Sequence, residues 1–421
     1  MDAEPRCTLY LLKKVKGESK LKILLRGQRS TLNKEHKADL ENNRGAVWIH
    51  AASVGEFEQA RPLIEKFKEE RLKIVVTFFS PSGYEARKNY DLADGVYYLP
   101  LATRRNARKF LEALQPRMAI FVKYEFWPAY LKELKKRNIP TYSISAIFRP
   151  TQRFFHWYGR SSLRLLKCFT HIYVQDEASR RLLAEHGVHD CSVTGDTRFD
   201  RVAQVMQERM NEPMNERLAP VAEFAQGCER VIVAGSTWPQ DEELLVRFVE
   251  RVNEYTNERT KLILVPHELN EDHLHMIFNL LQGRFVRYSA IEKGTGEMNA
   301  ESRRNILQRA NVLLIDTMGL LSSIYRFGQV AYIGGGFGVG IHNTIEAAVY
   351  GVPVVFGPNY HHFREAQGLI DAGAARSIKN YNELAQALTL ALAQHQTIGA
   401  KAAEYVKSEL GATQKIYEQI I

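Results

Sequence analysis

The sequence lacks any apolar run long enough to cross a membrane, although 45% of its 421 residues are hydrophobic. A membrane-spanning helix needs about 20 consecutive, mostly apolar residues, whereas the run at residues 8–12 is short and is followed by Lys13 and Lys14. No signal peptide is visible either. We therefore expect a globular chain with a full hydrophobic core, either soluble or peripheral to a membrane.

Cysteine is scarce, and its four copies form no C-x-x-C pair. Isolated cysteines indicate a reducing compartment and exclude a zinc ribbon. HExxH and Asp-x-Asp patterns are also missing, so no motif requires a metal. The sequence contains neither a G-x-S-x-G nucleophile elbow nor a Walker A loop, which excludes the usual designs of α/β-hydrolases and P-loop NTPases.

Positive charge is concentrated in the first half of the chain. The net charge is +9, but residues 1–200 hold 36 Lys and Arg against 23 Asp and Glu, whereas residues 201–421 hold 21 against 25. A basic half attracts anionic partners such as nucleic acid, a phospholipid surface or a phosphorylated substrate. A solvated basic surface without a partner is the alternative that composition leaves open.

Short runs rich in Val and Ile alternate with helical patterns along the chain. In the first half we expect strands at residues 47–53, 74–79, 95–99, 118–123, 141–146, 172–175 and 191–194. In the second half we expect strands at residues 230–237, 261–265, 285–288, 311–315, 330–333 and 353–356. The intervening residues 200–229 are polar and show no strand pattern, and the chain ends in predicted helices at residues 381–394 and 397–419.

Strands that alternate with helices form parallel sheets covered on both faces. We therefore predict an α/β fold with two Rossmann-like domains facing across a cleft, and ligands at the carboxyl ends of the strands. The predicted divisions are a basic N-terminal segment with one or two helices at residues 1–45, a first domain at residues 46–205, a second at residues 206–395 and a C-terminal helix at residues 396–421.

The most informative stretch is GGGFGVGIHNTIE at residues 334–346. With the apolar runs on either side, it predicts a strand, a glycine loop, a short helix and a strand. Glycines allow the backbone to turn tightly and to approach a ligand, and the N–H groups of the following helix favour a phosphate. Asn343 is placed to cap that helix, and Glu346 to bind a ribose hydroxyl. A tight turn without a ligand is the alternative.

Two glutamates follow strands of the predicted first sheet. Glu56 ends an S-V-G-E motif that we expect to form a turn, with a helix opening near Glu58 and Pro62 early in it. Glu56 is placed to act as a general base, or else to stabilise that helix N-terminus. Glu125 lies in the YEFWP motif after the fourth strand, where pairing with a cation would give it a structural role instead.

Cations and aromatic residues are interleaved after the predicted fifth strand. Ser145 and Arg149 come first, and RFFHWYGR at residues 153–160 follows. Such a segment suits phosphates, sugars or a bilayer interface. A partly buried helix rich in aromatic residues is the alternative.

Polar residues recur at other predicted strand ends. They form the motifs GDTR at residues 195–198, GST at residues 235–237, PHE at residues 266–268 and DTMG at residues 316–319. We also expect Thr237 to open a capping box for the next helix. Each motif alone reads as a loop or a cap, and it is their shared position at strand ends that predicts one site.

Taken together, these motifs resemble those of the 3-deoxy-D-manno-octulosonic acid (Kdo) transferases of lipopolysaccharide synthesis, which are GT-B glycosyltransferases. The motifs stand in the family's order and extend over nearly everything from residue 46 onward. The matching segments are residues 48–56, 124–128, 193–195, 198–200, 235–237, 316–319 and 335–358.

The resemblance implies inverting, metal-independent transfer of Kdo from CMP-Kdo to a lipid A precursor, without a separate cofactor. It implies Glu56 as the base, with Glu125 as the next candidate, and a C-terminal helix that crosses back to the first domain. Carried over by position, the cytidine monophosphate site comprises Met318, Gly335, Gly336, Gly338, Gly340, Asn343 and Glu346. The neighbouring strand ends add Ser236, Thr237 and His267 to the donor site. The acceptor is expected at Ser53, Arg149, Arg153 and Arg160.

Two other interpretations are compatible with the sequence. One is a UDP-sugar 2-epimerase of similar architecture, against which the S-V-G-E and YEFWP motifs argue. The other is a basic lipid- or RNA-binding protein without catalytic activity. For the Kdo transferase we expect no nucleic acid partner, and a peripheral location on the anionic cytoplasmic face of the bacterial inner membrane.

Overall fold

The computed structural model describes residues 27–28, 30–211, 216–282, 285–293, 299–338 and 340–421. The chain divides into two compact units. The first unit comprises residues 1–201 together with residues 409–421, and the second comprises residues 202–408. The expected basic segment at residues 1–45 lies largely outside the described residues, which include only its last part.

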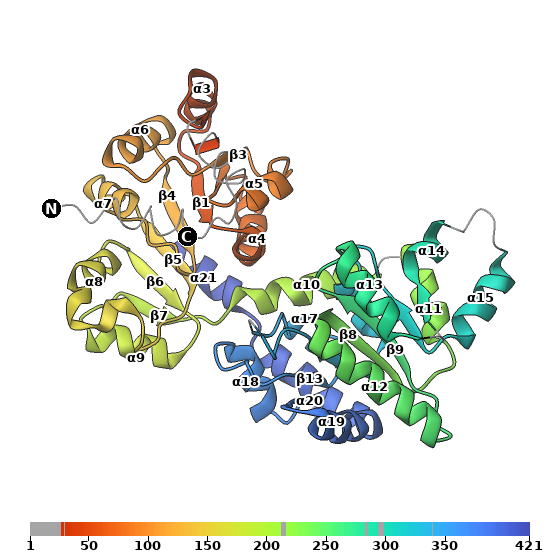
Figure 1. The fold of residues 1–421 in the computed structure, drawn as a ribbon. Helices are drawn as coiled ribbons and strands as arrows, with labels where there is room; N and C mark the ends of the chain where they lie inside the picture. Colours follow the sequence, from red (N-terminus) through yellow and green to blue (C-terminus); the bar gives the residue numbers. More distant parts are fainter. Residues whose placement is uncertain (1–26, 29, 212–215, 283–284, 294–298, 339) are drawn as a thin grey trace. The chain divides into compact units, whose positions relative to one another are not determined.

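The first unit contains a seven-stranded sheet in which every neighbouring pair of strands is parallel (Figure 1). The strand order is β3-β2-β1-β4-β5-β6-β7. The strands are β1 (Val47–Ala51), β2 (Ile74–Phe78), β3 (Gly95–Tyr98), β4 (Met118–Val122), β5 (Thr141–Ala146), β6 (His171–Val174) and β7 (Cys191–Val193). All seven coincide with predicted strands to within one or two residues.

Two layers of helices cover this sheet because successive side chains of a strand point to opposite faces. Val47 and Ile49 of β1 pack in one core cluster with Phe57 and Ile416, whereas Trp48 packs in the other with Phe110. The helices of the unit are α3 (Lys34–Asn42), α4 (Val54–Glu69), α5 (Pro81–Arg87), α6 (Arg104–Leu114), α7 (Pro128–Lys136), α8 (Arg160–Leu166), α9 (Glu177–Glu185), α21 (Ala412–Ile420) and the short 3₁₀ turns η1 (Arg153–Phe155) and η2 (Trp157–Gly159). Helix α10 (Thr197–Asn211) contains the boundary between the units.

The second unit contains another seven-stranded parallel sheet, in the order β10-β11-β9-β8-β12-β13-β14. Its strands are β8 (Val231–Thr237), β9 (Lys261–Pro266), β10 (Phe285–Arg287), β11 (Val312–Leu314), β12 (Val330–Ile333), β13 (Val354–Phe356) and β14 (Ala375–Ser377). Six of these were expected. The edge strand β14 was not, because three residues that include Arg376 give no hydrophobic pattern.

The helices of the second unit are mostly short. They are α11 (Ala219–Ala225), α12 (Pro239–Tyr255), α13 (Glu271–Leu280), α14 (Tyr288–Lys293), α15 (Ala300–Arg309), α16 (Leu321–Ile324), α17 (Ile345–Ala348), α18 (Arg364–Asp371), α19 (Tyr381–Ala393), α20 (His395–Ser408) and the 3₁₀ turns η3 (Glu216–Leu218) and η5 (Tyr325–Phe327). None of the helices in the described ranges is long and apolar enough to span a bilayer.

Two predicted helix starts are wrong. Helix α4 begins at Val54 rather than near Glu58, so residues 54–56 form its first turn and Pro62 lies in its interior. The Ser-x-x-Glu pattern that begins at Ser53 is a helix-start signal. Pro62 lacks the N–H for one helical hydrogen bond, and burial of the side chains of α4 compensates for this loss. Helix α12 begins after Trp238, whose backbone N–H donates to Asp241 at 3.0 Å. The expected capping residue is instead the last residue of β8.

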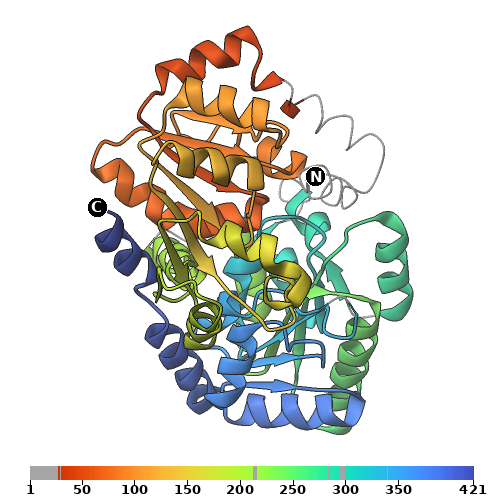
Figure 2. The same ribbon diagram turned by 90° about the vertical axis from the view of Figure 1, so that its left-hand side faces the viewer.

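The predicted helix at residues 397–419 is two helices. Gly411, with φ of 98°, separates α20 from α21. The Asp200 carboxylate accepts hydrogen bonds from Gly411 N (2.7 Å), Thr413 N (2.7 Å) and Thr413 Oγ1 (2.6 Å). Figure 2 shows the C-terminal end of the chain beside the elements of the first unit, and α21 packs against α4 there.

Candidate functional site

In both sheets the order in which successive strands are added reverses at the first strand of the unit. In the first unit β1 lies between β2 and β4, and in the second β8 lies between β9 and β12. At such a switch point the loops on the carboxyl side diverge, which is where α/β sheets bind ligands. The predicted residues Ser53, Glu56 and Glu125 follow β1 and β4. Most of the predicted donor residues follow β8, β9 and β12.

Glu56 occupies the third position of α4, half-buried at the carboxyl end of β1. Its carboxylate accepts a hydrogen bond from Ser53 Oγ. Burial raises the pKa of Glu56, and the charge of Glu125 raises it further, while Lys123 and the nearby backbone N–H groups act in the opposite direction. The structure therefore brings both predicted catalytic carboxylates, and the predicted acceptor residue Ser53, into one electrostatically coupled group.

Glu125 is held by an indole nitrogen and an imidazole nitrogen. Its Oε2 accepts a hydrogen bond from Trp127 Nε1 at 2.7 Å and lies 3.1 Å from His50 Nε2. Lys123, between β4 and Glu125, has a φ of 57°, a left-handed conformation that is unusual for a residue with a side chain. Strained backbone of this kind is common where groups are held at a functional site.

A buried ion pair lies close to these carboxylates. Asp196 is fully buried, and its Oδ2 is 2.7 Å from the guanidinium of Arg198. Burial alone would raise the pKa of Asp196, but Arg198 and Lys123 together lower it below its ordinary value. Lys123 thus faces both Glu56 and Asp196, and it keeps the group of carboxylates from carrying uncompensated negative charge.

The predicted acceptor cations are only partly brought together. Arg149 donates to the hydroxyl of Tyr124 at 3.1 Å, which places it beside the YEFWP motif. Arg153 and Arg160 lie on the surface and form no hydrogen bond or ion pair with Glu56 or Glu125. They flank two exposed aromatic side chains, Trp157 and Tyr158, whose exposed fractions are 85% and 57%.

In the second unit the glycine loop is tightly closed. Gly335 has φ of 89° and Gly340 φ of 119°, conformations that favour glycine, and Gly340 N donates to Gly335 O at 3.1 Å. Gly336 lies against Gly357, so a Cβ at Gly336 would come within 2.6 Å of backbone atoms. Gly338 is exposed, and a Cβ there would meet no heavy atom within 4 Å.

One N–H of this loop already has an anionic partner inside the protein. Gly335 N donates to the Asp241 carboxylate at 3.0 Å, and Tyr332 Oη donates to the same carboxylate at 2.7 Å. Burial raises the pKa of Asp241, and the hydrogen bonds from Gly335 and Tyr332 oppose that rise. Of the predicted glycines, Gly335 is therefore engaged with α12, and the exposed Gly338 lies at the tip of the loop.

Asn343 and Glu346 lie together after the glycine loop. Asn343 Nδ2 donates to Glu346 Oε1 at 2.9 Å, and Asn343 Oδ1 accepts from Ile345 N at 3.1 Å. Asn343 therefore caps the first N–H of α17, as predicted, although the residue that precedes the helix is Thr344. Burial raises the pKa of Glu346, while Asn343 and Arg209 act to lower it.

The remaining donor residues are at the ends of β8, β9 and β11. The hydroxyl of Thr237 is buried and donates to Glu242 at 2.9 Å. Ser236 is half-buried with φ of 54°. His267 is exposed after β9, and Met318 is 76% exposed after β11.

His267 lies between the ring of His342, which follows the glycine loop, and the ring of Trp238, which the sequence did not assign to the site. It stacks on Trp238 at 5.0 Å between ring centroids, and the tilted ring of His342 lies at 4.4 Å. Trp238 Nε1 and His342 Nε2 are both buried without a hydrogen-bond partner. Burial, together with His267, lowers the pKa of His342 to about 4, so its ring is neutral at pH 7. Three rings from three different loops thus form one face with two unused polar atoms.

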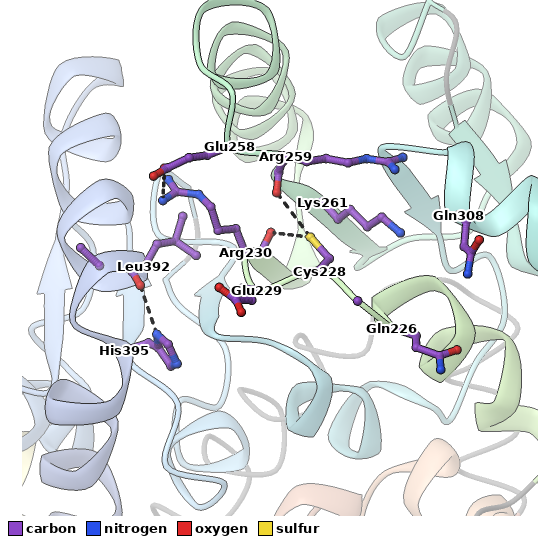
Figure 3. Close-up of a pocket in the computed structure, with 12 residues that line it drawn as sticks. Gln226, Cys228, Glu229, Arg230, Glu258, Arg259, Lys261, Gln308, Leu392 and His395 are labelled. Carbon is purple, nitrogen blue, oxygen red and sulfur yellow. Dashed lines mark hydrogen bonds and ion pairs between the residues drawn. The ribbon is translucent and has the colours of Figure 1, made fainter.

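A pocket of about 750 Å³ lies at the opposite edge of the second sheet, beside the residues that precede β8 and β9 (Figure 3). Its charges are largely satisfied internally: Arg230 pairs with Glu258, and Lys261 Nζ donates to Phe224 O. Because α/β sheets bind ligands at the carboxyl ends of their strands, we do not place the donor in this pocket.

The side chains missed from sequence share one property: their partners are distant in the chain. His50 and Glu125 are 75 positions apart, and Gly335 and Asp241 are 94 apart. The sequence offered one signal for these side chains, their position after predicted parallel strands. That signal identifies the edge of the sheet at which the site lies, but not which side chains make contact there. Among the described residues, no group of three or more His, Cys, Asp or Glu side chains could hold a metal ion.

A family model that matches this sequence covers residues of the first unit. Residues 26–201 match the family model of 3-deoxy-D-manno-octulosonic-acid transferase (kdotransferase). Over 359 residues the chain is 27% identical to the 3-deoxy-D-manno-octulosonic acid transferase of Aquifex aeolicus, a match that covers 84% of this chain and 88% of that one. The protein of the same name from Haemophilus influenzae is 25% identical over 390 residues, with 88% and 86% covered.

Solved structures establish the architecture of the chain. A UDP-GlcNAc 2-epimerase from Neisseria meningitidis, bound to UDP-GlcNAc, has a TM-score of 0.63 over 89% of this chain and 99% of that chain, at 16% identity. A putative UDP-N-acetylglucosamine 2-epimerase from Listeria monocytogenes has a TM-score of 0.60 over 89% and 97%, at 14% identity. The predicted GT-B fold class, with two Rossmann-like sheets, is confirmed.

The closure of the glycine loop leads to a prediction about stability. A Cβ at Gly334 would lie 2.2 Å from Ser236 O and 2.6 Å from Thr237 Cα. Gly334→Ala must push β12 away from β8, and we expect it to lower the free energy of unfolding by about 1–3 kcal/mol. Gly338→Ala is the matched control, because its Cβ meets open space. Thermal unfolding measures both, and equal melting temperatures would contradict this account of the loop.

Proposed function

We propose that the chain is a 3-deoxy-D-manno-octulosonic acid transferase that transfers Kdo from CMP-Kdo to a lipid A precursor, with inversion at the anomeric carbon; the match of residues 26–201 to that family's model supports this proposal. The observation that carries this proposal is the coupled pair Glu56 and Glu125 at the switch point of the first sheet. A raised pKa in a carboxylate that remains partly accessible is the property expected of a general base.

Glu56 is the proposed base. The acceptor hydroxyl is a poor nucleophile until its proton is removed as the new glycosidic bond forms. A positioned base contributes about 10²–10⁴-fold to such a step. Burial and Glu125 make Glu56 more basic than an ordinary glutamate, which strengthens its pull on the hydroxyl proton.

We propose that the second unit binds the donor. The loop tip at Gly338, the Asn343–Glu346 pair and the stack of Trp238, His267 and His342 lie at or after the carboxyl ends of β8, β9 and β12. The three rings offer flat surfaces and the unused Trp238 and His342 nitrogens, which suits a base or sugar. The reaction proceeds without a metal in this proposal.

The proposed domains keep their sequence-derived limits. The first, at residues 46–205, would bind the acceptor, with Ser53, Arg149, Arg153 and Arg160 facing it. The second, at residues 206–395, would bind the donor. The tail at residues 396–421 was expected to return to the first; only its residues 409–421 belong to the first unit, where α21 packs against α4.

The experiment that tests this function is a transfer assay. The protein is incubated with freshly generated CMP-Kdo and a tetra-acylated lipid A precursor, and products are analysed by mass spectrometry. A mass increase of one or more Kdo units is expected. Conversion of a UDP-sugar to its 2-epimer would instead favour the epimerase interpretation, and the absence of both products from a folded sample would favour a non-catalytic binding protein.

Glu56→Gln should separate catalysis from helix stabilisation. We expect turnover to fall by at least about a hundred-fold, because Gln cannot take the proton. The folded-state pKa of Glu56 is raised, so ionisation of Glu56 opposes folding, and its contribution to stability is lost as the pH rises through that pKa. At pH 7 the variant should therefore unfold at the same or a higher temperature than the parent.

The control is Glu69→Gln, which changes an exposed carboxylate at the other end of the same helix. It should leave turnover and unfolding unchanged. If Glu56→Gln lowers turnover only in proportion to a loss of folded protein, Glu56 is a helix-stabilising residue and Glu125 becomes the candidate base.

Glu346→Ala should weaken the binding of cytidine monophosphate. A lost hydrogen bond to a charged group costs about 1.5–3 kcal/mol, so calorimetry should show an affinity about ten- to a hundred-fold lower. Glu250→Ala, an exposed residue of α12, is the control and should bind like the parent. Equal affinities for both variants would remove Glu346 from the donor site.

We also propose that the protein works at the cytoplasmic face of the inner membrane, where Trp157 and Tyr158 and the cations around them meet anionic lipid. Each well-placed cation contributes about 1 kcal/mol, and the attraction weakens with salt. Arg160→Gln should lower vesicle binding about five-fold at low salt, whereas Arg309→Gln in the second unit should not. If the fraction of protein that co-sediments with vesicles depends neither on salt concentration nor on anionic lipid, the proposal is contradicted.

A further inference from the structure

Buried polar side chains of β1 and β2 form a hydrogen-bonded series that ends at Glu125. Trp48 Nε1 donates to Thr77 Oγ1 at 2.9 Å, and Thr77 Oγ1 lies 2.9 Å from His50 Nδ1. On the other side of the ring, His50 Nε2 lies 3.1 Å from Glu125 Oε2, which also accepts from Trp127 Nε1. His50 has no exposed surface. Neither the family resemblance nor the mechanism proposed above assigns a role to His50.

The neighbours of His50 determine where its proton lies. Since Thr77 Oγ1 accepts from Trp48, its own hydroxyl proton is available to His50 Nδ1. This assignment leaves the ring proton on Nε2, where it donates to Glu125. The backbone carbonyl oxygen of Thr77 also lies 3.0 Å from His50 Nδ1.

We propose that His50 is a positioning residue for the transfer reaction: its Nε2–H fixes the Glu125 carboxylate beside Glu56. The inference rests on the proposed function, because it assigns His50 a part in that reaction. His50 would touch neither substrate, and it acts only through Glu125.

The geometry around Glu125 supports a positioning role. Both donors bind the same oxygen, Oε2, so the plane of the carboxylate is fixed while Oε1 is turned away from them. The His50 ring is itself confined by edge-to-face contacts with Phe121 and Trp127, at 5.8 and 5.6 Å between centroids. Burying a polar ring in a central strand costs desolvation free energy that an aliphatic side chain does not. The hydrogen bonds of His50 therefore explain why a histidine occupies this position.

The consequence for Glu56 follows from the charges that face it. These are the like charge of Glu125 and the opposite charge of Lys123, which also acts on the Asp196–Arg198 pair. If Glu125 turns away, its like charge no longer raises the pKa of Glu56, and Glu56 becomes a weaker base. The acidic limb of the pH–rate profile should then move to lower pH, with a lower plateau.

Two amide substitutions test this with matched side chains. The amide nitrogen of Gln reaches the place of Nε2, so His50→Gln keeps a donor for Glu125. That of Asn reaches only the place of Nδ1, so His50→Asn keeps the Thr77 contact and loses the donor. We expect kcat to fall about ten- to a hundred-fold in His50→Asn, with a shifted acidic limb and an unchanged donor KM, and to remain near the parent value in His50→Gln.

The opposing result is equally clear. If the two variants have the same kcat and pH profile once corrected for the folded fraction, His50 is a satisfied core residue and the proposal is overturned.

A second measurement does not depend on the reaction. In a double-mutant cycle of His50→Asn and Glu125→Gln, followed by thermal unfolding, the effects should be non-additive, as for residues in contact. Additive effects would overturn the proposal by themselves. If the parent protein transfers no Kdo, the proposed function fails, and the cycle still decides whether His50 holds Glu125.

Discussion

The parallel hydrogen bonding of β1 to β2 and β4 is the constraint on which the first unit depends. It joins Val47 to Ile74 on one side and to Met118 on the other. With this register, three strands end at the same edge and the loops after β1 and β4 diverge from a common point. The loops that carry Glu56 and Glu125 therefore start side by side, although 69 positions separate the two glutamates in sequence. The second unit repeats the arrangement around β8.

The sequence predicts the strands well because buried parallel strands are continuous runs of Val, Ile and Phe. It predicts their ends less well. Residues 54–56 look like a turn because glycine follows valine, yet they form the first turn of α4, since the Ser53–Glu56 pattern and a buried face outweigh one glycine and Pro62. Strand β14 is missed because three residues at a sheet edge carry no periodicity.

The site is predictable as a place and not as a set of contacts. Glu56, Glu125 and the glycine loop are found from their position after apolar runs. The use of Gly335 N–H by Asp241, and the stack of Trp238, His267 and His342, depend on which strands become neighbours. The glycines, too, have roles that sequence alone does not distinguish. Gly334 and Gly336 lie so close to neighbouring backbone atoms that a Cβ would not fit, whereas a Cβ at Gly338 would meet open space.

The bond between Asp200 and the turn at Gly411 and Thr413 has a consequence for synthesis of the protein. The first unit is made of residues from both ends of the chain, and the second is inserted within it. During translation the inserted unit is complete before the last helix of the first unit has been made. The first unit is therefore completed only after the second, and its α4 face, which packs Ile416 in the mature fold, stays uncovered until residues 409–421 have been made.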